Sequence, residues 1–150
     1  MFQVIARVGL LALVFISLAP HALIGIDDHH DGLILYSIND LVNRGLWPGS
    51  EFSQYGPLHN TLAAVPAMLG LKSYVWTKLL LAFSYASAGL AFVMLFNRLR
   101  APLLGVAALL FYLYYYPFYD EVQIVWASGY AMVLSVWMQY LLAGWLTLWP

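Results

Sequence analysis

Residues 26–59 read IDDHHDGLILYSINDLVNRGLWPGSEFSQYGPLH, and they interrupt a chain that is otherwise almost entirely apolar. Five of the seven carboxylates and three of the four histidines of the protein fall inside this stretch. Such a concentration of polar residues between apolar segments indicates either a catalytic loop at a membrane surface or an ordinary hydrated connector. The stretch also fixes where the rest of the chain divides into helices.

The composition outside this stretch predicts an all-α integral membrane protein. The chain is 63% hydrophobic and 9% charged, with a mean hydropathy of +0.79, whereas roughly a quarter of the residues of a soluble domain are charged. A formal net charge of −1 implies no nucleic-acid partner. The absence of cysteine excludes disulfides, thiol chemistry and cysteine-based metal sites.

The uncharged intervals suggest about four transmembrane helices in a single membrane domain, residues 1–150. A helix needs ~20 largely apolar residues to cross the hydrocarbon core of a bilayer. Five intervals compete for this role: 8–26, 52–71, 79–97, 101–119 and 122–150. We interpret the chain as the N-terminal portion of a longer protein, because no polar tail follows its last span.

The first interval fits either an uncleaved anchor or a signal peptide. The anchor is favoured, because the sequence Ala-Pro-His-Ala at 19–22 is only loosely a cleavage site and apolar residues continue to Ile26. Arg7 then lies in the cytoplasm by the positive-inside rule, and the polar stretch emerges on the external face.

An amphipathic helix on the membrane surface is predicted within the polar stretch, beginning after Asp31 or Gly32 and ending at Gly45. Gly45 can supply the left-handed residue that ends a helix. The apolar residues of this helix recur at helical spacing: Ile34, Ile38, Leu41 and Val42.

The segment 57–71, PLHNTLAAVPAMLGL, decides the topology, because counting it as a span reverses the orientation of everything after it. A helix of this length would extend only about 22 Å, and Pro66 weakens it further. We therefore predict a short interfacial helix that does not cross. All seven carboxylates then lie outside, and three segments cross: 74–97, 101–117 and 126–149.

Two external loops carry the candidate site residues. Asp28, His30 and Asp31 belong to the run Asp-Asp-His-His-Asp, in which a carboxylate can act as a general base and Asp or His can bind a divalent cation. The alternative is that Asp31 caps the following helix and the others are solvated. Asp120 and Glu121, between two apolar intervals, either mark the membrane boundary or face the same cavity.

A second group of candidates precedes or begins the short helix. Glu51, Gln54 and Tyr55 could line a binding site, with His59 one turn inside the helix. The alternative for each is an ordinary loop or capping residue.

The order of these parts resembles the N-terminal region of polyprenyl-phosphate-dependent glycosyltransferases of the GT-C superfamily, which include protein mannosyltransferases and lipid A aminoarabinose transferases. The matching elements are His30-Asp31-Gly32, the helix at 33–44, Gly45-Leu-Trp-Pro48, and Gln54-Tyr55-Gly56-Pro57-Leu58. The resemblance covers essentially all 150 residues as an ordered pattern, but no single motif is long.

The resemblance implies roles for individual acids. Asp31 matches the loop acid that acts as base or binds the acceptor, and Asp120 matches the second external acid. Gln54 falls where some members have a Glu ligand. This chain has Gly32 where many members have Glu, so Asp28 or Glu51 would substitute.

The resemblance also implies a cation for the lipid phosphate. Tyr55 stands where some members have a lysine, so Lys72 or Lys78 would take that role. His30 and Glu51 are the candidate ligands if a divalent cation, Mg or Mn, takes part.

The implied activity is transfer of a sugar from a polyprenyl-phosphate donor to a glycan, lipid or protein acceptor. It would take place at the external face of a bacterial inner (plasma) membrane. The alternative is a non-catalytic multi-span protein, a transporter or assembly subunit, with a cation-binding acidic loop. A transporter should place ionisable groups near the bilayer midplane, and the predicted spans contain only His21.

Overall fold

The computed structural model describes residues 2–24, 30–46, 57–71, 74–115 and 127–146, and these are helical with short connections. This confirms the predicted all-α class. The elements in chain order are α1 (Phe2–Ala22), α2 (His30–Asn39), the π-helical turn η1 (Asp40–Arg44), α3 (Pro57–Met68), α4 (Tyr74–Arg98), α5 (Pro102–Tyr115) and α6 (Ala127–Leu146).

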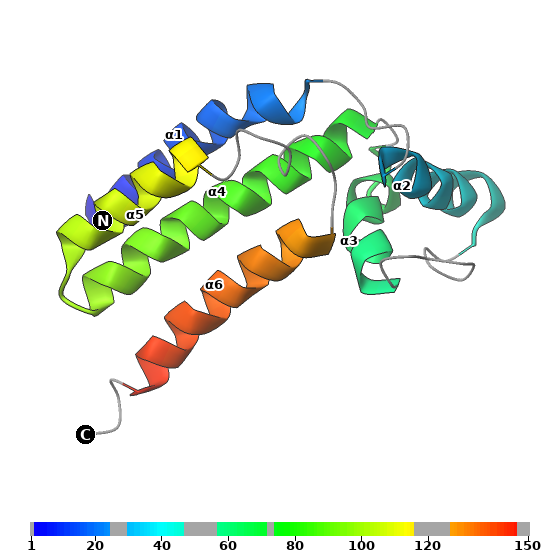
Figure 1. The fold of residues 1–150 in the computed structure, drawn as a ribbon. Helices are drawn as coiled ribbons and strands as arrows, with labels where there is room; N and C mark the ends of the chain where they lie inside the picture. Colours follow the sequence, from blue (N-terminus) through cyan, green and yellow to red (C-terminus); the bar gives the residue numbers. More distant parts are fainter. Residues whose placement is uncertain (1, 25–29, 47–56, 72–73, 116–126, 147–150) are drawn as a thin grey trace.

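Helix α4 is the centre of the bundle, and α1, α5 and α6 all pack against it. Figure 1 shows α4 in green running between the blue α1 and the orange α6. Its buried face is rich in small side chains. Small side chains let the backbones of two helices approach closely, as is common at helix contacts in membrane proteins. The small buried residues of α4 are Ala82, Ala86, Ala88, Gly89 and Ala91.

The closest approach of three helices lies at Gly89. A Cβ added there would lie 3.0 Å from Leu109 Cδ1 of α5 and 3.5 Å from Val14 Cγ1 of α1. Nearby, the Tyr112 hydroxyl donates a hydrogen bond to the carbonyl of Tyr85, at 3.1 Å. Polar side chains therefore also join α5 to α4 inside the bundle.

Helix α1 contributes directly to this core. Val14, Leu18 and Ala22 are fully buried, and the helix continues through Pro20 to Ala22. Loss of α1 would expose the face of α4 that these residues cover. The choice between a retained anchor and a signal peptide for α1 stays a prediction.

A small helical lobe made of α2, η1 and α3 lies against the N-terminal part of α4. Ile34 and Ile38, which the sequence predicts on the apolar face of a helix at the membrane surface, are buried in the core of the protein. The lobe helix begins at His30, earlier than expected, so Asp31 lies in its first turn instead of preceding it. Gly45 has φ 65° and ends η1 in the left-handed conformation, which confirms the predicted stop.

Helix α3 is 12 residues long, about 18 Å at 1.5 Å per residue. Pro66 does not break it, contrary to expectation, because the helix continues to Met68. It ends at Gly70, which has φ 86°, with the Leu71 N–H donating to the Pro66 carbonyl at 2.8 Å. A helix this short does not reach across a bilayer unaided, and its position at one membrane surface stays a prediction.

Two described helices are long and apolar enough to cross a membrane: Gln3–Ala22 within α1 and Tyr74–Arg98, which is α4. Over their described residues α5 and α6 are shorter apolar helices. Two of the expected spans are therefore supported by length and composition, and the crossing of α5 and α6 stays a prediction.

Candidate functional site

The helix ends that flank the polar stretch lie together at one end of the bundle. Figure 1 shows the C-terminal end of α1, the α2–η1–α3 lobe and the N-terminal end of α4 meeting there. Helix α5 runs back toward this end and α6 leads away from it. We call this region, the lobe together with the first two turns of α4, the polar end.

The structure describes only part of the predicted site. His30 and Asp31 lie in the first turn of α2 and His59 in the first turn of α3, but their side chains are outside the described set. Lys78 is the one predicted site residue whose side chain is described. The remaining predicted residues lie outside the described ranges: Asp28, Glu51, Gln54, Tyr55, Lys72, Asp120 and Glu121.

Buried polar side chains concentrate at the polar end. Among the described residues, the buried polar or charged side chains are Asp40, Asn60, Thr77 and Lys78. They come from η1, α3 and the start of α4. The other described residues of α1, α4, α5 and α6 include no buried residue of the polar or charged types. Burial of a polar group is unfavourable unless the group has a hydrogen-bond partner. We therefore take the polar end, where these side chains cluster, as the candidate functional site.

Thr77 connects α4 to the lobe. Its hydroxyl is buried and donates a hydrogen bond to the Ala63 carbonyl of α3, at 2.9 Å. Ala63 and Ala64 are themselves fully buried, so their small side chains let the two backbones approach. This contact fixes the height of α3 on α4 and therefore the position of His59, one turn before Ala63.

Lys78 follows Thr77 and is only 3% exposed. Its Nζ lies 5.9 Å from the centre of the Tyr74 ring, one turn earlier on α4. A buried ammonium over an aromatic face is partly compensated for lost hydration. The sequence suggested Lys78 as an external, phosphate-binding cation, and the structure places it inside the polar end of the protein instead of on an open surface.

Asp40 is a buried carboxylate that the sequence analysis did not single out. It is 6% exposed and accepts a hydrogen bond from Arg44 Nη1 at 3.1 Å. The i, i+4 spacing of the two residues is a sequence signal for such a pair. Burial of Asp40 was not predictable, because it depends on the π-helical turn, which changes the direction of the side chains after Asn39.

Within the described parts of the chain, no group of three metal-ligating side chains comes together. The two candidate metal ligands, His30 and Glu51, have side chains outside the described set. The prediction of a divalent cation, Mg or Mn, is therefore not tested by the structure.

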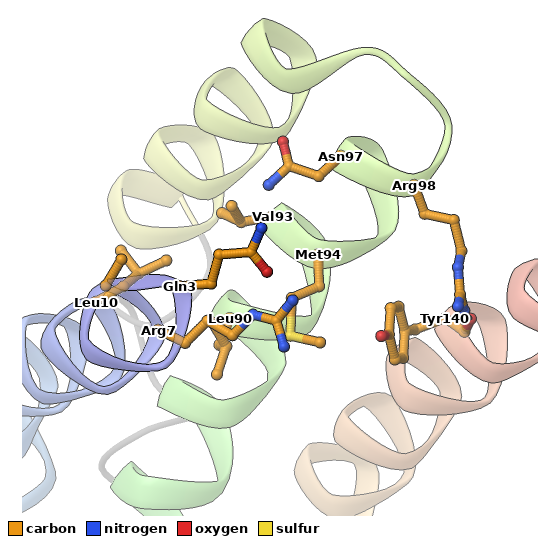
Figure 2. A pocket seen from close by; sticks show the side chains of 10 residues that line it. Gln3, Arg7, Leu10, Leu90, Val93, Met94, Asn97, Arg98 and Tyr140 are labelled. Carbon is orange, nitrogen blue, oxygen red and sulfur yellow. Dashed lines mark hydrogen bonds between the residues drawn. The ribbon is translucent and has the colours of Figure 1, made fainter. Parts of the chain in front are cut away.

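A cavity of about 530 Å³ lies at the opposite end of α4 from the polar end. Figure 2 shows Gln3 and Arg7 of α1, Asn97 and Arg98 of α4, and Tyr140 of α6 around it. Twenty residues of α4 separate Lys78 from Arg98, about 30 Å along the helix. This cavity is therefore distinct from the acid-bearing region.

No family model, curated protein or solved structure matches the chain.

Proposed function

We propose that this chain is the N-terminal membrane module of a glycosyltransferase that uses a polyprenyl-phosphate-linked sugar and acts at the external face. The observation that carries the proposal is the gathering of buried polar side chains at the polar end. That end also carries the ends of α1 and α3 that flank the first acid-bearing stretch, residues 26–59. A lipid-phosphate donor requires such a position, because its phosphate lies at the membrane surface and its chain lies in the hydrocarbon.

The order of the helices supports the same proposal. A long apolar helix is followed by α2 with η1, which ends at Gly45, then by a short helix and a second long apolar helix. This order agrees with the GT-C resemblance. The placement of Asp31 in the first turn of α2 is also suited to a functional carboxylate, because a helix N-terminus favours the negative charge.

In the proposed reaction Asp31 takes the proton from an acceptor hydroxyl. The acceptor oxygen then forms a bond to the anomeric carbon of the sugar while the bond from that carbon to the phosphate oxygen breaks. The electron pair leaves with the polyprenyl phosphate, whose charge Lys78 or Lys72 would balance. General-base assistance contributes typically 10²–10⁴-fold to such a step, roughly the loss expected without it.

The experiment compares Asp31→Asn with the unmodified full-length protein. Purified protein in membranes receives polyprenyl-phosphate-linked sugars carrying a radioactive label, and loss of label from the lipid fraction is measured. We expect Asp31→Asn to reduce this loss by roughly two or more orders of magnitude. Its thermal stability should change little, because Asn has nearly the same shape and loss of a charge in the first turn of a helix costs only about 0.3–1 kcal/mol.

Asp40→Asn is the matched control, because it makes the same chemical change nine residues later in the same lobe. It removes the ion pair with Arg44 and should lower the unfolding temperature without abolishing transfer by the folded protein. Full activity of Asp31→Asn would refute the role of Asp31. A protein that neither consumes any polyprenyl-phosphate-linked sugar nor binds polyprenyl phosphate in native mass spectrometry would refute the proposed function and favour a non-catalytic membrane subunit.

A further inference from the structure

The cavity between the start of α1 and the end of α4 combines a basic rim with an apolar interior. Arg7 and Arg98 supply the two charges, and Gln3 and Asn97 supply amide groups. The apolar part of the lining comes from Leu10, Leu90, Val93 and Met94. A volume of about 530 Å³ is within the size range of cavities that bind small molecules and headgroups.

Among the residues that the structure describes, the helices around this cavity carry no carboxylate side chain. The segments 2–22, 74–98 and 127–146, which form the three helices around it, contain no Asp or Glu at all. The carboxylates of the chain lie instead in 27–51 and 120–121. Arg100 adds a third positive charge just beyond α4, so the described residues at this end of the bundle include three arginines.

Arg98 is held in place by α6. Its Cζ lies 5.0 Å from the centre of the Tyr140 ring, and Nη1 donates to the Tyr140 carbonyl at 3.4 Å. The guanidinium of Arg98 occupies the space beside Gly144, one turn after Tyr140 on α6. A Cβ at Gly144 would lie 2.9 Å from Arg98 Cζ and would overlap the guanidinium. Since a guanidinium has five N–H donors, Arg98 retains donors for a ligand after making this contact.

Arg7 approaches the same cavity from α1, and Figure 2 shows its side chain extending toward Met94 in the direction of α6. Arg7 and Arg98 reach the cavity from different helices, and each guanidinium can bind the oxygens of a phosphate through paired N–H donors. The apolar residues beneath them extend the site in the direction of the hydrocarbon.

We propose that this cavity binds the phosphate headgroup of an anionic phospholipid, in the leaflet on the side of Arg7 and Arg98, which the predicted topology places toward the cytoplasm. The lipid phosphate interacts with Arg7 and Arg98, and the first part of an acyl chain contacts the apolar lining. A soluble phosphate ion would match only the rim. Basic pockets between membrane helices on the cytoplasmic side are suited to anionic headgroups, and this site is independent of the proposed transferase activity.

The test measures lipid binding to the purified complete chain in detergent by native mass spectrometry, with phosphatidylglycerol and phosphatidylcholine as probes. We expect preferential binding of phosphatidylglycerol. Arg7→Gln and Arg98→Gln should each weaken it about tenfold, equivalent to about 1.4 kcal/mol. Arg100→Gln is the matched control: it removes the same charge at the same end but does not line the cavity, and it should retain most of the binding.

Gly144→Ala provides a second test that changes no charge. Its new methyl group displaces the Arg98 guanidinium from Tyr140, so phosphatidylglycerol binding should weaken several-fold while the unfolding temperature stays close to that of the unmodified protein. Wild-type binding by both Arg7→Gln and Arg98→Gln would overturn the proposal. An equal loss of phosphatidylglycerol binding in Arg100→Gln would show that the lipid responds to surface charge and not to the cavity. Displacement of bound lipid by millimolar inorganic phosphate would identify a soluble anion as the ligand.

Discussion

Two buried glycines of the bundle, Gly89 and Gly105, should respond to different extents to the same substitution by alanine. At Gly89 the added Cβ would lie 3.0 Å from Leu109 Cδ1, the far end of a flexible side chain that can rotate away. At Gly105 it would lie 3.0 Å from Phe96 Cβ and 3.4 Å from the Cα of Val93, and neither atom can move without moving helix α4.

The magnitudes follow from two opposing terms. Replacing a helical glycine by alanine gains up to about 1 kcal/mol in helix propensity, whereas overpacking a close contact costs typically 1–3 kcal/mol. For Gly89→Ala the side-chain adjustment is small, so we expect a free energy of unfolding within about 0.5 kcal/mol of the unmodified protein, the range of substitutions that disturb no packing. For Gly105→Ala the overpacking term dominates, and we expect a net loss of roughly 1–2 kcal/mol.

Gly9→Ala isolates the propensity term, because an added Cβ at this exposed position of α1 meets nothing within 4 Å. Unfolding of the three variants in mixed micelles, followed by circular dichroism, should rank Gly9→Ala as most stable, Gly89→Ala next and Gly105→Ala last. A Gly105→Ala variant as stable as Gly9→Ala would refute the packing of α5 against α4 that the argument uses.

Further variants test other parts of the fold. Arg100 has φ 59° at the turn after α4, so Arg100→Gly should stabilise the protein by about 1 kcal/mol in the same unfolding assay, because glycine adopts this conformation without strain. Thr77→Val removes the donor to the Ala63 carbonyl and should cost about 1 kcal/mol, with faster amide exchange in α3 but not in α1. Single cysteines at the exposed positions Asn43 and Leu69 should be labelled from the same side of the membrane; labelling from opposite sides would show that α3 crosses.

The sequence by itself determined the helical class and much of the helix pattern. The span predicted at 74–97 agrees to within a residue with α4, Tyr74–Arg98. Such bounds are predictable because polar and charged residues at the ends of an apolar segment are visible in the sequence. Gly45 was identified as a helix end for the same reason. The spacing of Ile34 and Ile38 placed them on one apolar face of a helix, but the sequence assigned that face to the membrane surface and not to the protein core, where they lie.

Some local features were missed because several weak signals compete over a few residues. The sequence predicted that the helix begins after Asp31 or Gly32. It begins at His30, so Asp31 lies inside its first turn. Pro66 was expected to break α3, but packing against α4 keeps the helix intact to Met68, because tertiary contacts override local propensity. The π-helical turn that follows Asn39 has no recognisable sequence signature.

Only the tertiary structure decided which polar groups are buried and which lie together. Lys78 is a charged residue near a helix end, where the sequence favours exposure, but the contact between Thr77 and α3 covers this part of α4. Arg7 and Arg98 are separated by ninety positions and form one cavity only because α1 and α4 pack side by side. The physical reason is that helix formation depends on neighbours in the chain, whereas the approach of two helices depends on side-chain size at distant positions.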